Sequence, residues 1–456
     1  MQKHFEMESA KAHKTEEMKV AFLTLGCKVN FYETEKMMQD FKEHGFEIVD
    51  FNRESDVYII NTCTVTNIAD RKSRQMIHRA KKKSPDSIVA AVGCYVESGG
   101  EELKKDSSID VSFSNKDKSS VAVKVLSYLK EIEKYREDKY TEKCAVQGKN
   151  TSLDRTRKYI KIQDGCNQFC SYCMIPYVRG GGVLSSRDEE DVLAEIRDVA
   201  SQGFKEVVIT GIHLSSYGVD KSEEKQFVNL KGRPLVELLQ RIDGIPGIER
   251  IRLGSLEPRI ICEEFMDELA KVSKLCPHFH LSLQSGCDMT LKRMNRHYTA
   301  EEYRRKCEMI RRYYEHPAIT TDLIAGFPGE TEEEFETTRN FVRDCRLADI
   351  HVFKYSMRNG TKAAKMENQV SPDIKHKRSE ILIAETEKLK REYASWFVGK
   401  EELVLFEEVR KIGEKEYLTG HNERYVLFGV PIDEARKKGY AENQIVPVEI
   451  RESNLL

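Results

Sequence analysis

The sequence predicts an α/β protein built from three parts. Short apolar runs alternate with amphipathic stretches through the first two parts, which is typical of parallel strands joined by helices. The last part instead alternates Val, Leu, Phe and Tyr with charged residues between glycine turns, which is typical of an antiparallel sheet. We therefore expect an N-terminal doubly wound parallel-sheet domain (18–135), a central partial α/β barrel (158–397) and a small C-terminal antiparallel β domain (398–456).

The N-terminal part contains three apolar, β-branched runs that predict buried strands, at 20–26, 57–61 and 88–93. Amphipathic stretches at 31–45 and 67–83 predict the helices between them. This strand–helix–strand order produces a parallel sheet.

Two charged segments flank this part of the chain. Residues 1–17 lack the apolar core of a signal peptide, so we expect a mobile tail. Residues 136–157 predict a linker to the central part.

Six apolar runs in the central part predict strands, each followed by a helical stretch: 158–163, 206–211, 248–255, 278–285, 318–327 and 349–356. Successive strand–helix units of this kind favour a parallel sheet that closes partway into a barrel. The last helix is expected to begin at Ser371 and Pro372, because proline is favoured at the first helical position.

The composition limits the protein's environment and partners. Twelve cysteines without an export signal favour a reducing, cytoplasmic setting, where cysteines act as ligands, nucleophiles or packing groups. No apolar run is long enough to span a membrane. The net charge of −2 means that a nucleic-acid partner requires local basic patches. Residues 70–83 and 296–312 are such patches, although solvated helix faces are the commoner explanation.

The stretch "QDGCNQFCSYCMIP" places Cys166, Cys170 and Cys173 in a C-x3-C-x2-C arrangement. Structural zinc usually has four protein ligands, and ferredoxin-type clusters also have four thiolates. This loop follows a strand, so it lies at the carboxyl edge of a parallel sheet, where α/β folds bind ligands. Three thiolates on a [4Fe–4S] cluster leave one iron open to an outside ligand.

Three further cysteines, Cys27, Cys63 and Cys94, each end one of the buried strand runs of the N-terminal part. Because the carboxyl ends of parallel strands share one edge of a sheet, these three thiols are expected to converge. The alternative is that they are ordinary buried core cysteines, which are common. Their identical placement after each strand favours a second three-thiolate site.

These residues carry a resemblance. The C-x3-C-x2-C loop, with Tyr172 between its last two cysteines, resembles the signature loop of radical S-adenosylmethionine (SAM) enzymes. Together with "LGCKVNFYETE", "NTCTVTNIADRKSR" and "AVGCY", it resembles the methylthiotransferases over residues 18–456. Further matching stretches are "VVITGIHLSSYG", "GSLEP", "HFHLSLQSGCDMTLKRMNRHYT" and "DLIAGFPGETEEEF". The C-terminal β domain is similar to a TRAM domain, an RNA-binding module.

The resemblance implies two [4Fe–4S] clusters and SAM as cofactors. Cys166, Cys170 and Cys173 would hold the cluster that cleaves SAM, and Cys27, Cys63 and Cys94 would hold an auxiliary cluster carrying the sulfur to be inserted. One SAM would supply the methyl group, and a second would supply the radical that removes hydrogen from adenine C2.

Within the family, the sequence is most similar to the branch that acts on threonylcarbamoyladenosine at position 37 of tRNA. The implied partners are the anticodon region of tRNA and an electron donor such as flavodoxin or ferredoxin. The resemblance assigns no catalytic side chain beyond the cluster ligands.

Candidate SAM contacts lie in the loops after the barrel strands, where Gly and Ser residues let the backbone approach a ligand: Tyr172, Thr210, Gly211, Ser282, Gln284 and Gly326. Ordinary tight turns explain these loops nearly as well. Arg71, Lys72 and Arg74 follow Cys63 and are candidates for contacts with RNA phosphates. The segment Arg179–Arg187 is longer and less basic than is usual in the family, and it is expected to alter a loop near the substrate.

Two groups of alternatives remain open at this level. Related methylthiotransferases modify isopentenyladenosine in tRNA or an aspartate of a ribosomal protein. A non-enzymatic iron–sulfur electron carrier, an RNA-binding protein or a zinc module belongs to a different class. An electron carrier predicts four cysteines per cluster, so three cysteines at each site argue against it.

Overall fold

The computed structural model describes residues 18–132 and 156–456. The predicted tail (1–17) and the predicted linker as far as residue 155 lie outside the described residues. The described chain divides into two compact units. The first unit contains residues 18–26, 33–63 and 70–132, and the second contains residues 27–32, 64–69 and 156–456.

The N-terminal sheet is entirely parallel, with the strand order β2-β1-β3-β4-β5. This is a doubly wound order, as the sequence predicts. Successive strands are added to one side of β1 and then, from β3 onward, to its other side, so the switch point lies between β1 and β3. The strands are β1 (Lys19–Thr24), β2 (Glu47–Val49), β3 (Val57–Thr62), β4 (Ile88–Gly93) and β5 (Val111–Phe113). The short edge strands β2 and β5 were not predicted, because three residues are too few to show a periodic pattern.

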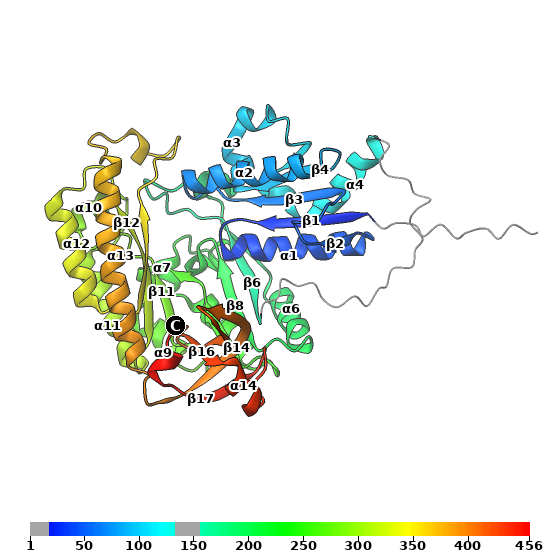
Figure 1. The fold of residues 1–456 in the computed structure, drawn as a ribbon. Coiled ribbons are helices and arrows are strands. Elements are labelled where there is room, and N and C mark those ends of the chain that lie inside the picture. Colours follow the sequence, from blue (N-terminus) through cyan, green and yellow to red (C-terminus); the bar gives the residue numbers. More distant parts are fainter. Residues whose placement is uncertain (1–17, 133–155) are drawn as a thin grey trace, which may run out of the picture. The chain divides into compact units, whose positions relative to one another are not determined.

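Helices cover both faces of this sheet (Figure 1). They are α1 (Lys28–Glu43), α2 (Asn67–Lys83), α3 (Cys94–Lys104) and α4 (Val121–Glu131). Helices α1 and α4 pack into the core on one face, and α2 packs on the other. All six residues of β3 are therefore buried. The predicted helix 67–83 is confirmed, and the predicted helix 31–45 starts earlier, at Lys28.

The central part forms an open barrel of parallel strands, which confirms the predicted partial barrel. A single stretch of chain joins its two sheets, since β9 pairs with β8 and β10, one residue later, pairs with β11. The short β7 adds an antiparallel edge. The strands are β6 (Arg157–Asp164), β7 (Ser185–Ser186), β8 (Glu206–Gly211), β9 (Arg250–Leu253), β10 (Ser255–Leu256), β11 (His278–Leu281), β12 (Ala318–Ala325) and β13 (Asp349–Lys354).

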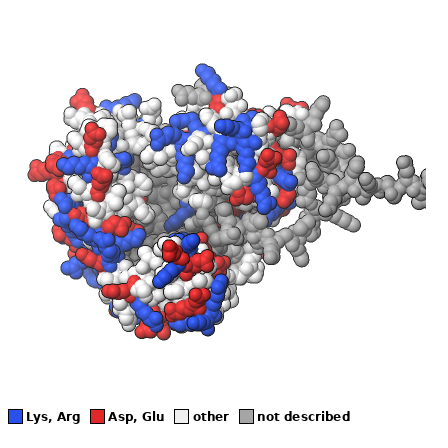
Figure 2. Space-filling model, viewed as in Figure 1, with Lys and Arg blue, Asp and Glu red and all other residues white. Residues whose placement is uncertain are grey.

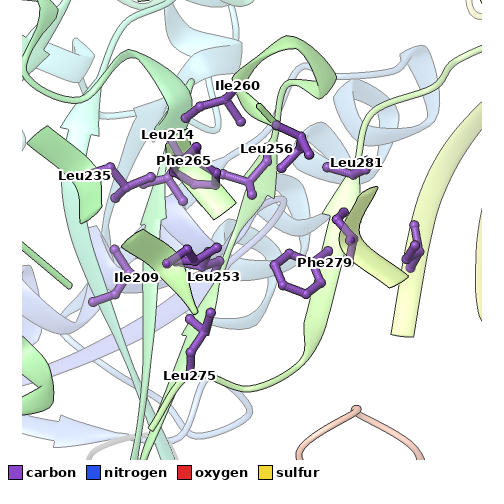
Figure 3. Packing of buried hydrophobic residues seen from close by; sticks show 14 of the residues in the cluster. Ile209, Leu214, Leu235, Leu253, Leu256, Ile260, Phe265, Leu275, Phe279 and Leu281 are labelled. Carbon is purple, nitrogen blue, oxygen red and sulfur yellow. The ribbon is translucent and has the colours of Figure 1, made fainter. Parts of the chain in front are cut away.

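Helices on the outside of the barrel complete its hydrophobic core. Figure 3 shows Ile209, Leu253 and Phe279 of the strands in one hydrophobic cluster with Leu235 of α8 and Phe265 of α9. The helices are α5 (Ile175–Val178), α6 (Glu189–Ser201), α7 (Phe227–Leu230), α8 (Arg233–Asp243), α9 (Glu263–Leu269), α10 (Asp288–Arg293), α11 (Ala300–Tyr313), α12 (Glu332–Cys345) and α13 (Pro372–Ser395).

The predicted start of the last helix is confirmed. Ser371 is the N-cap of α13, and its hydroxyl accepts a hydrogen bond from the Ile374 amide at 3.4 Å. Pro372 occupies the first helical position, where the missing N–H costs nothing. No helix of the described ranges is long and apolar enough to cross a membrane.

The C-terminal part is a four-stranded antiparallel sheet of order β16-β15-β14-β17, as predicted. Its strands are β14 (Glu401–Ile412), β15 (Lys415–His421), β16 (Leu427–Pro431) and β17 (Ile445–Glu449), with the helix α14 (Ile432–Lys438) after β16.

A buried ionic network at the amino ends of the barrel strands attaches this sheet to the barrel. Glu206, the first residue of β8, pairs with Arg252 (2.8 Å), Arg157 (3.6 Å) and Arg250 (3.9 Å). The guanidinium groups also donate to the C-terminal sheet and its β15–β16 loop. Arg250 donates to the Leu403 carbonyl at 2.6 Å, and Arg252 to the carbonyls of Glu423 (2.8 Å) and Asn422 (3.3 Å).

We predict that Glu206→Gln destabilises the protein by about 3 kcal/mol at pH 7, since the buried Arg250 and Arg252 lose their carboxylate partner and Arg157 keeps only Glu407. Burial alone raises the pKa of Glu206, but Arg252 and Arg157 outweigh it and lower the pKa from 4.5 to about 2. The stabilisation is therefore complete above pH 4.5 and disappears as the pH falls through about 2. Urea unfolding between pH 7 and pH 3 measures this, and the variant should show a weaker pH dependence than the wild type.

The matched control is Glu249→Gln, which removes an exposed carboxylate paired with Lys205 at 2.7 Å. This change should cost less than about 1 kcal/mol. Equal stabilities of the Glu206→Gln variant and the wild type at pH 7 would contradict the assigned role of the network.

Candidate active site

The loop that carries Cys166, Cys170 and Cys173 connects β6 to α5 at the carboxyl end of the barrel strands. Gly165 starts the loop with φ +77°, and a Cβ there would lie 1.9 Å from the Val183 carbonyl oxygen. Only glycine fits this contact, because the predicted long segment Arg179–Arg187 folds back against the cysteine loop. The Cys173 amide donates to the Cys170 carbonyl at 3.0 Å and closes a turn between the two thiols.

The three thiols lie close enough to affect one another's ionisation. Burial, together with the neighbouring Cys170, raises the pKa of Cys166 to about 11. Burial and the same neighbour raise the pKa of Cys173 further. Partly buried thiols with raised pKa values bind cations only by releasing protons, so a metal or cluster here would replace those protons.

A second loop, Arg293–Arg296, holds the cysteine loop in place. The hydroxyl of Ser171 donates to the Arg293 carbonyl at 2.8 Å, and its amide donates to the Met294 carbonyl at 3.0 Å. The amide side chain of Asn295 donates to the Phe169 carbonyl at 3.1 Å. Four backbone carbonyl or amide groups thus fix one loop against the other.

Arg296 adds a direct contact to a thiol. Its Nη1 donates to Cys170 Sγ at 3.3 Å, its Nε donates to the Tyr298 hydroxyl at 2.8 Å, and its Nη2 donates to the Ser282 carbonyl at 3.1 Å. The sequence grouped Arg296 with the basic patch 296–312, but the structure places it within the site. The signal that was missed is its position in the matched stretch "MNRHYT".

The candidate SAM residues all lie in loops or strand ends at the carboxyl edge of the barrel. Thr210 and Gly211 are the last two residues of β8. Ser282 directly follows β11, and its hydroxyl lies 2.9 Å from the Ser255 hydroxyl. Gln284 is buried and has a φ of +72°. The Tyr172 ring lies edge-on to the Phe327 ring, with 6.3 Å between the two ring centroids. Arg296 links Ser282 to Cys170, so these two residues belong to one site.

The loop after β12 is fixed by a buried carboxylate. Glu330 accepts hydrogen bonds from the Gly326 amide and from Arg378 Nη1, both at 2.8 Å. Burial raises the pKa of Glu330, and the Gly326 amide and Arg378 oppose that shift. Glu330 directly precedes Thr331, the N-cap of α12, so the same carboxylate lies beside the N-terminus of that helix.

The N-terminal sheet places its three cysteines at its carboxyl edge. Cys63 and Cys94 directly follow β3 and β4, and Cys27 comes three residues after β1. The strands β1, β3 and β4 are neighbours, and the edge between β1 and β3 is the switch point where doubly wound sheets bind ligands. The amide side chain of Asn115 lies 3.7 Å from Cys94 Sγ.

The candidate phosphate-binding residues lie on helix α2. Arg71, Lys72 and Arg74 are all exposed, and Arg74 also donates to the Tyr95 hydroxyl at 3.0 Å and lies over its ring. Figure 2 shows Lys and Arg side chains gathered over this part of the N-terminal unit. All three side chains are therefore presented to solvent.

Comparison with protein families matches both cysteine sets. Residues 160–342, which contain Cys166, Cys170 and Cys173, match the Radical SAM superfamily. Residues 19–114, which contain Cys27, Cys63 and Cys94, match a second family described as Uncharacterized protein family UPF0004.

Three similar proteins extend over most of the chain. The threonylcarbamoyladenosine tRNA methylthiotransferase MtaB of Bacillus subtilis (strain 168) is 40% identical over 89% of each chain. The protein of the same name from Aquifex aeolicus is 39% identical, covering 90% of this chain and 98% of its own. A tRNA-2-methylthio-N(6)-dimethylallyladenosine synthase of Clostridium botulinum (strain Langeland) is 34% identical over 87% of each chain.

The fold is also similar to that of solved structures. The radical S-adenosylmethionine methyltransferase TsrM from Kitasatospora setae, solved with tryptophan and a SAM analogue, has a TM-score of 0.53. It covers 74% of this chain and 73% of its own at 15% identity, so the similarity supports the architecture alone.

We predict that Glu330→Gln lowers the free energy of unfolding by about 3–5 kcal/mol, because it leaves Arg378 buried without its closest counterion. Denaturant unfolding of the purified chain measures the change. Glu332→Gln is the matched control, since Glu332 contacts the same arginine at 2.9 Å but its side chain is 69% exposed. The control should cost less than about 1 kcal/mol, and equal losses in the two variants would show that burial does not matter here.

Proposed function

The chain belongs to the radical-SAM methylthiotransferase family, and on that premise we propose that it attaches a methylthio group to C2 of N6-threonylcarbamoyladenosine at position 37 of tRNA. The observation that carries the choice of nucleoside is the 40% identity to the Bacillus subtilis relative named for threonylcarbamoyladenosine. The Clostridium botulinum relative named for dimethylallyladenosine is 34% identical, which makes that nucleoside the second candidate.

The residues of the central part fit the cofactors of the family. Cys166, Cys170 and Cys173 offer three thiolates, the ligand type that iron–sulfur clusters use. When bound, a [4Fe–4S] cluster and SAM supply the one-electron chemistry that produces a 5′-deoxyadenosyl radical. Arg296 donates a hydrogen bond to Cys170, and such bonds to cluster sulfur stabilise negative charge and tune the reduction potential. Tyr172, Thr210, Gly211, Ser282, Gln284 and Gly326 remain the candidates for SAM contacts.

We assign Cys27, Cys63 and Cys94 to a second [4Fe–4S] cluster. Support comes from the order of the N-terminal sheet, whose neighbouring strands β1, β3 and β4 each lead into one of these cysteines at the carboxyl edge. Three protein thiolates leave one iron of a cubane open. An open iron suits a cluster that carries a transferable sulfur.

The assignment of whole domains follows the same reasoning. The proposed division is a methylthiotransferase domain at 18–135, a radical-SAM domain at 158–397 and a TRAM-like RNA-binding domain at 398–456. The reduction of SAM requires an electron donor of low potential, such as flavodoxin or ferredoxin. The RNA partner is the anticodon region of tRNA. Both kinds of partner are cytoplasmic, so the cytoplasm is the proposed location of this protein.

The deciding experiment analyses modified nucleosides. Purified enzyme, reconstituted anaerobically and reduced, is given SAM and tRNA bearing threonylcarbamoyladenosine. We expect the methylthio derivative in the nucleoside digest by mass spectrometry, and no product from tRNA bearing isopentenyladenosine. Product from the isopentenyl substrate alone would reject the proposed nucleoside in favour of the second candidate.

Two cysteine variants separate the clusters in the same assay. Cys166→Ala should abolish 5′-deoxyadenosine formation, since one ligand of the SAM-cleaving cluster is lost. Cys63→Ala should retain 5′-deoxyadenosine formation but give no methylthio product, and its iron content should fall by about half. Normal methylthio transfer by Cys63→Ala would reject the second cluster.

We further propose that α2 contacts the phosphates of the tRNA. Arg71 and Lys72 are exposed on this helix, which begins at Asn67, four residues after Cys63. Cationic side chains at this position would hold RNA next to the carboxyl edge of the N-terminal sheet. Arg74 supports the helix indirectly through Tyr95.

The double variant Arg71→Ala/Lys72→Ala should weaken tRNA binding and reduce the slope of log affinity against log salt by about 1 for each residue. Filter binding at several salt concentrations measures the slope. Lys271→Ala/Lys388→Ala, which removes two side chains that are 61% and 60% exposed on the other unit, is the charge-matched control and should leave the slope unchanged. Equal slopes in all three proteins would exclude α2 from the RNA interface.

A further inference from the structure

Three side chains of metal-ligand type, none of them a cysteine, meet on the barrel strands. They are His280 of β11, Asp322 of β12 and His351 of β13. One ligand atom from each lies within 4.8 Å of the other two. Across residues 18–132 and 156–456, no other group of three or more His, Cys, Asp or Glu side chains comes this close.

The strand geometry explains why these three residues meet. Asp322 and His351 are directly opposite in the parallel pairing of β12 and β13, and His280 is opposite Thr320, two residues before Asp322. Their neighbours along each strand pack into the hydrophobic core under the helices: Phe279, Leu281, Leu323, Ile350 and Val352. Because side chains alternate between the faces of a strand, the three ligand-type residues share the opposite, inner face of the barrel.

The distances suit a small divalent cation. His280 Nε2 lies 3.3 Å from one oxygen of Asp322, and His351 Nδ1 lies 3.2 Å from the other. Nitrogen and oxygen ligands at the usual 2.0–2.1 Å from zinc lie about 3.3 Å apart in a tetrahedral site. Each histidine nitrogen thus lies as far from its own Asp322 oxygen as two ligands of one ion lie from each other, and the three ligand atoms are all within 4.8 Å of one another.

The surroundings of His280 also favour metal binding. Its Nδ1 lies 3.0 Å from the Thr320 hydroxyl, and metal-binding histidines commonly donate this second ring nitrogen to an oxygen. With Nδ1 protonated, Nε2 presents a lone pair to the Asp322 carboxylate. Two acceptors at that separation need a cation between them, either a proton or a metal ion.

The number of imidazoles distinguishes this group from the other histidine–carboxylate pairs named next. Other histidine–carboxylate pairs, such as His78–Asp106 and His376–Glu380, consist of one imidazole and one carboxylate, which a single proton satisfies. At Asp322 two imidazoles converge on one carboxylate from two neighbouring strands. Two imidazole nitrogens and one carboxylate oxygen form a ligand set typical of zinc and of non-haem Fe(II).

We propose that His280, Asp322 and His351 bind one divalent cation of the zinc class on the inner face of the barrel. Three protein ligands leave a fourth position open to water or to another oxygen or nitrogen ligand. None of the three ligands is a cluster cysteine, and the Gln284 amide donates to the Asp322 backbone carbonyl at 2.9 Å, so the site adjoins one of the candidate SAM residues.

The test uses the holoenzyme with its clusters loaded, so that zinc cannot occupy the cysteines. The protein is equilibrated anaerobically with zinc chloride, washed with a mild chelator, and its zinc and iron are measured by mass spectrometry. We expect about one zinc per wild-type chain. His351→Ala and Asp322→Asn should lose the zinc and keep the iron, whereas His376→Ala, a surface histidine outside the site, should keep both.

Two conservative variants guard against misfolding. His351→Cys supplies another zinc ligand and should retain zinc, whereas Thr320→Val removes only the oxygen facing His280 and should weaken zinc binding roughly 10-fold. Absence of zinc from the wild type would leave a protonated His–Asp–His cluster and overturn the proposal. Retention of zinc by both His351→Ala and Asp322→Asn would overturn it as well.

Discussion

One buried carboxylate, Glu206, organises the amino-terminal end of the barrel and its connection to the C-terminal sheet. Its carboxylate pairs with Arg252, Arg157 and Arg250, which are all buried. Arg250 and Arg252 also donate hydrogen bonds to backbone carbonyls of the C-terminal part. Buried guanidinium groups cannot remain without partners, so the barrel and the sheet depend on each other. This network thus attaches the C-terminal sheet at the amino ends of the barrel strands, and the cysteine loop lies at their carboxyl ends.

The carboxyl edge of parallel strands is the second constraint on this protein. In the central part, the loops after β6, β11 and β12 carry the C-x3-C-x2-C cysteines and most of the candidate SAM residues. In the N-terminal sheet, the same edge leads from β1, β3 and β4 into Cys27, Cys63 and Cys94. Both parallel sheets therefore lead into cysteine triplets by one rule of strand direction, although their helices and loops differ.

The contacts that hold the active loops were less predictable. Arg296 looked like part of a solvated basic face, yet it donates to Cys170 and to the Ser282 carbonyl. Glu330 directly precedes a helix N-cap in sequence, and the fold makes it the buried partner of Arg378, 48 residues away. Arg74 is exposed on α2, and the fold adds a hydrogen bond from it to the Tyr95 hydroxyl. Charged residues have no periodicity that distinguishes a surface role from a buried pair, so only the folded chain identifies these roles.

The sequence by itself determined the three-part architecture and the positions of the six strand-associated cysteines, because hydrophobic periodicity and cysteine spacing are local properties of the chain. The motifs around those cysteines carried the resemblance to the family. The tertiary structure alone decided which distant side chains meet. It joined β9 to β10 as the link between two sheets, set Glu206 among its arginines, and brought His280, Asp322 and His351 together from three strands. These contacts depend on strand register and on the packing of elements far apart in sequence, which no local pattern records.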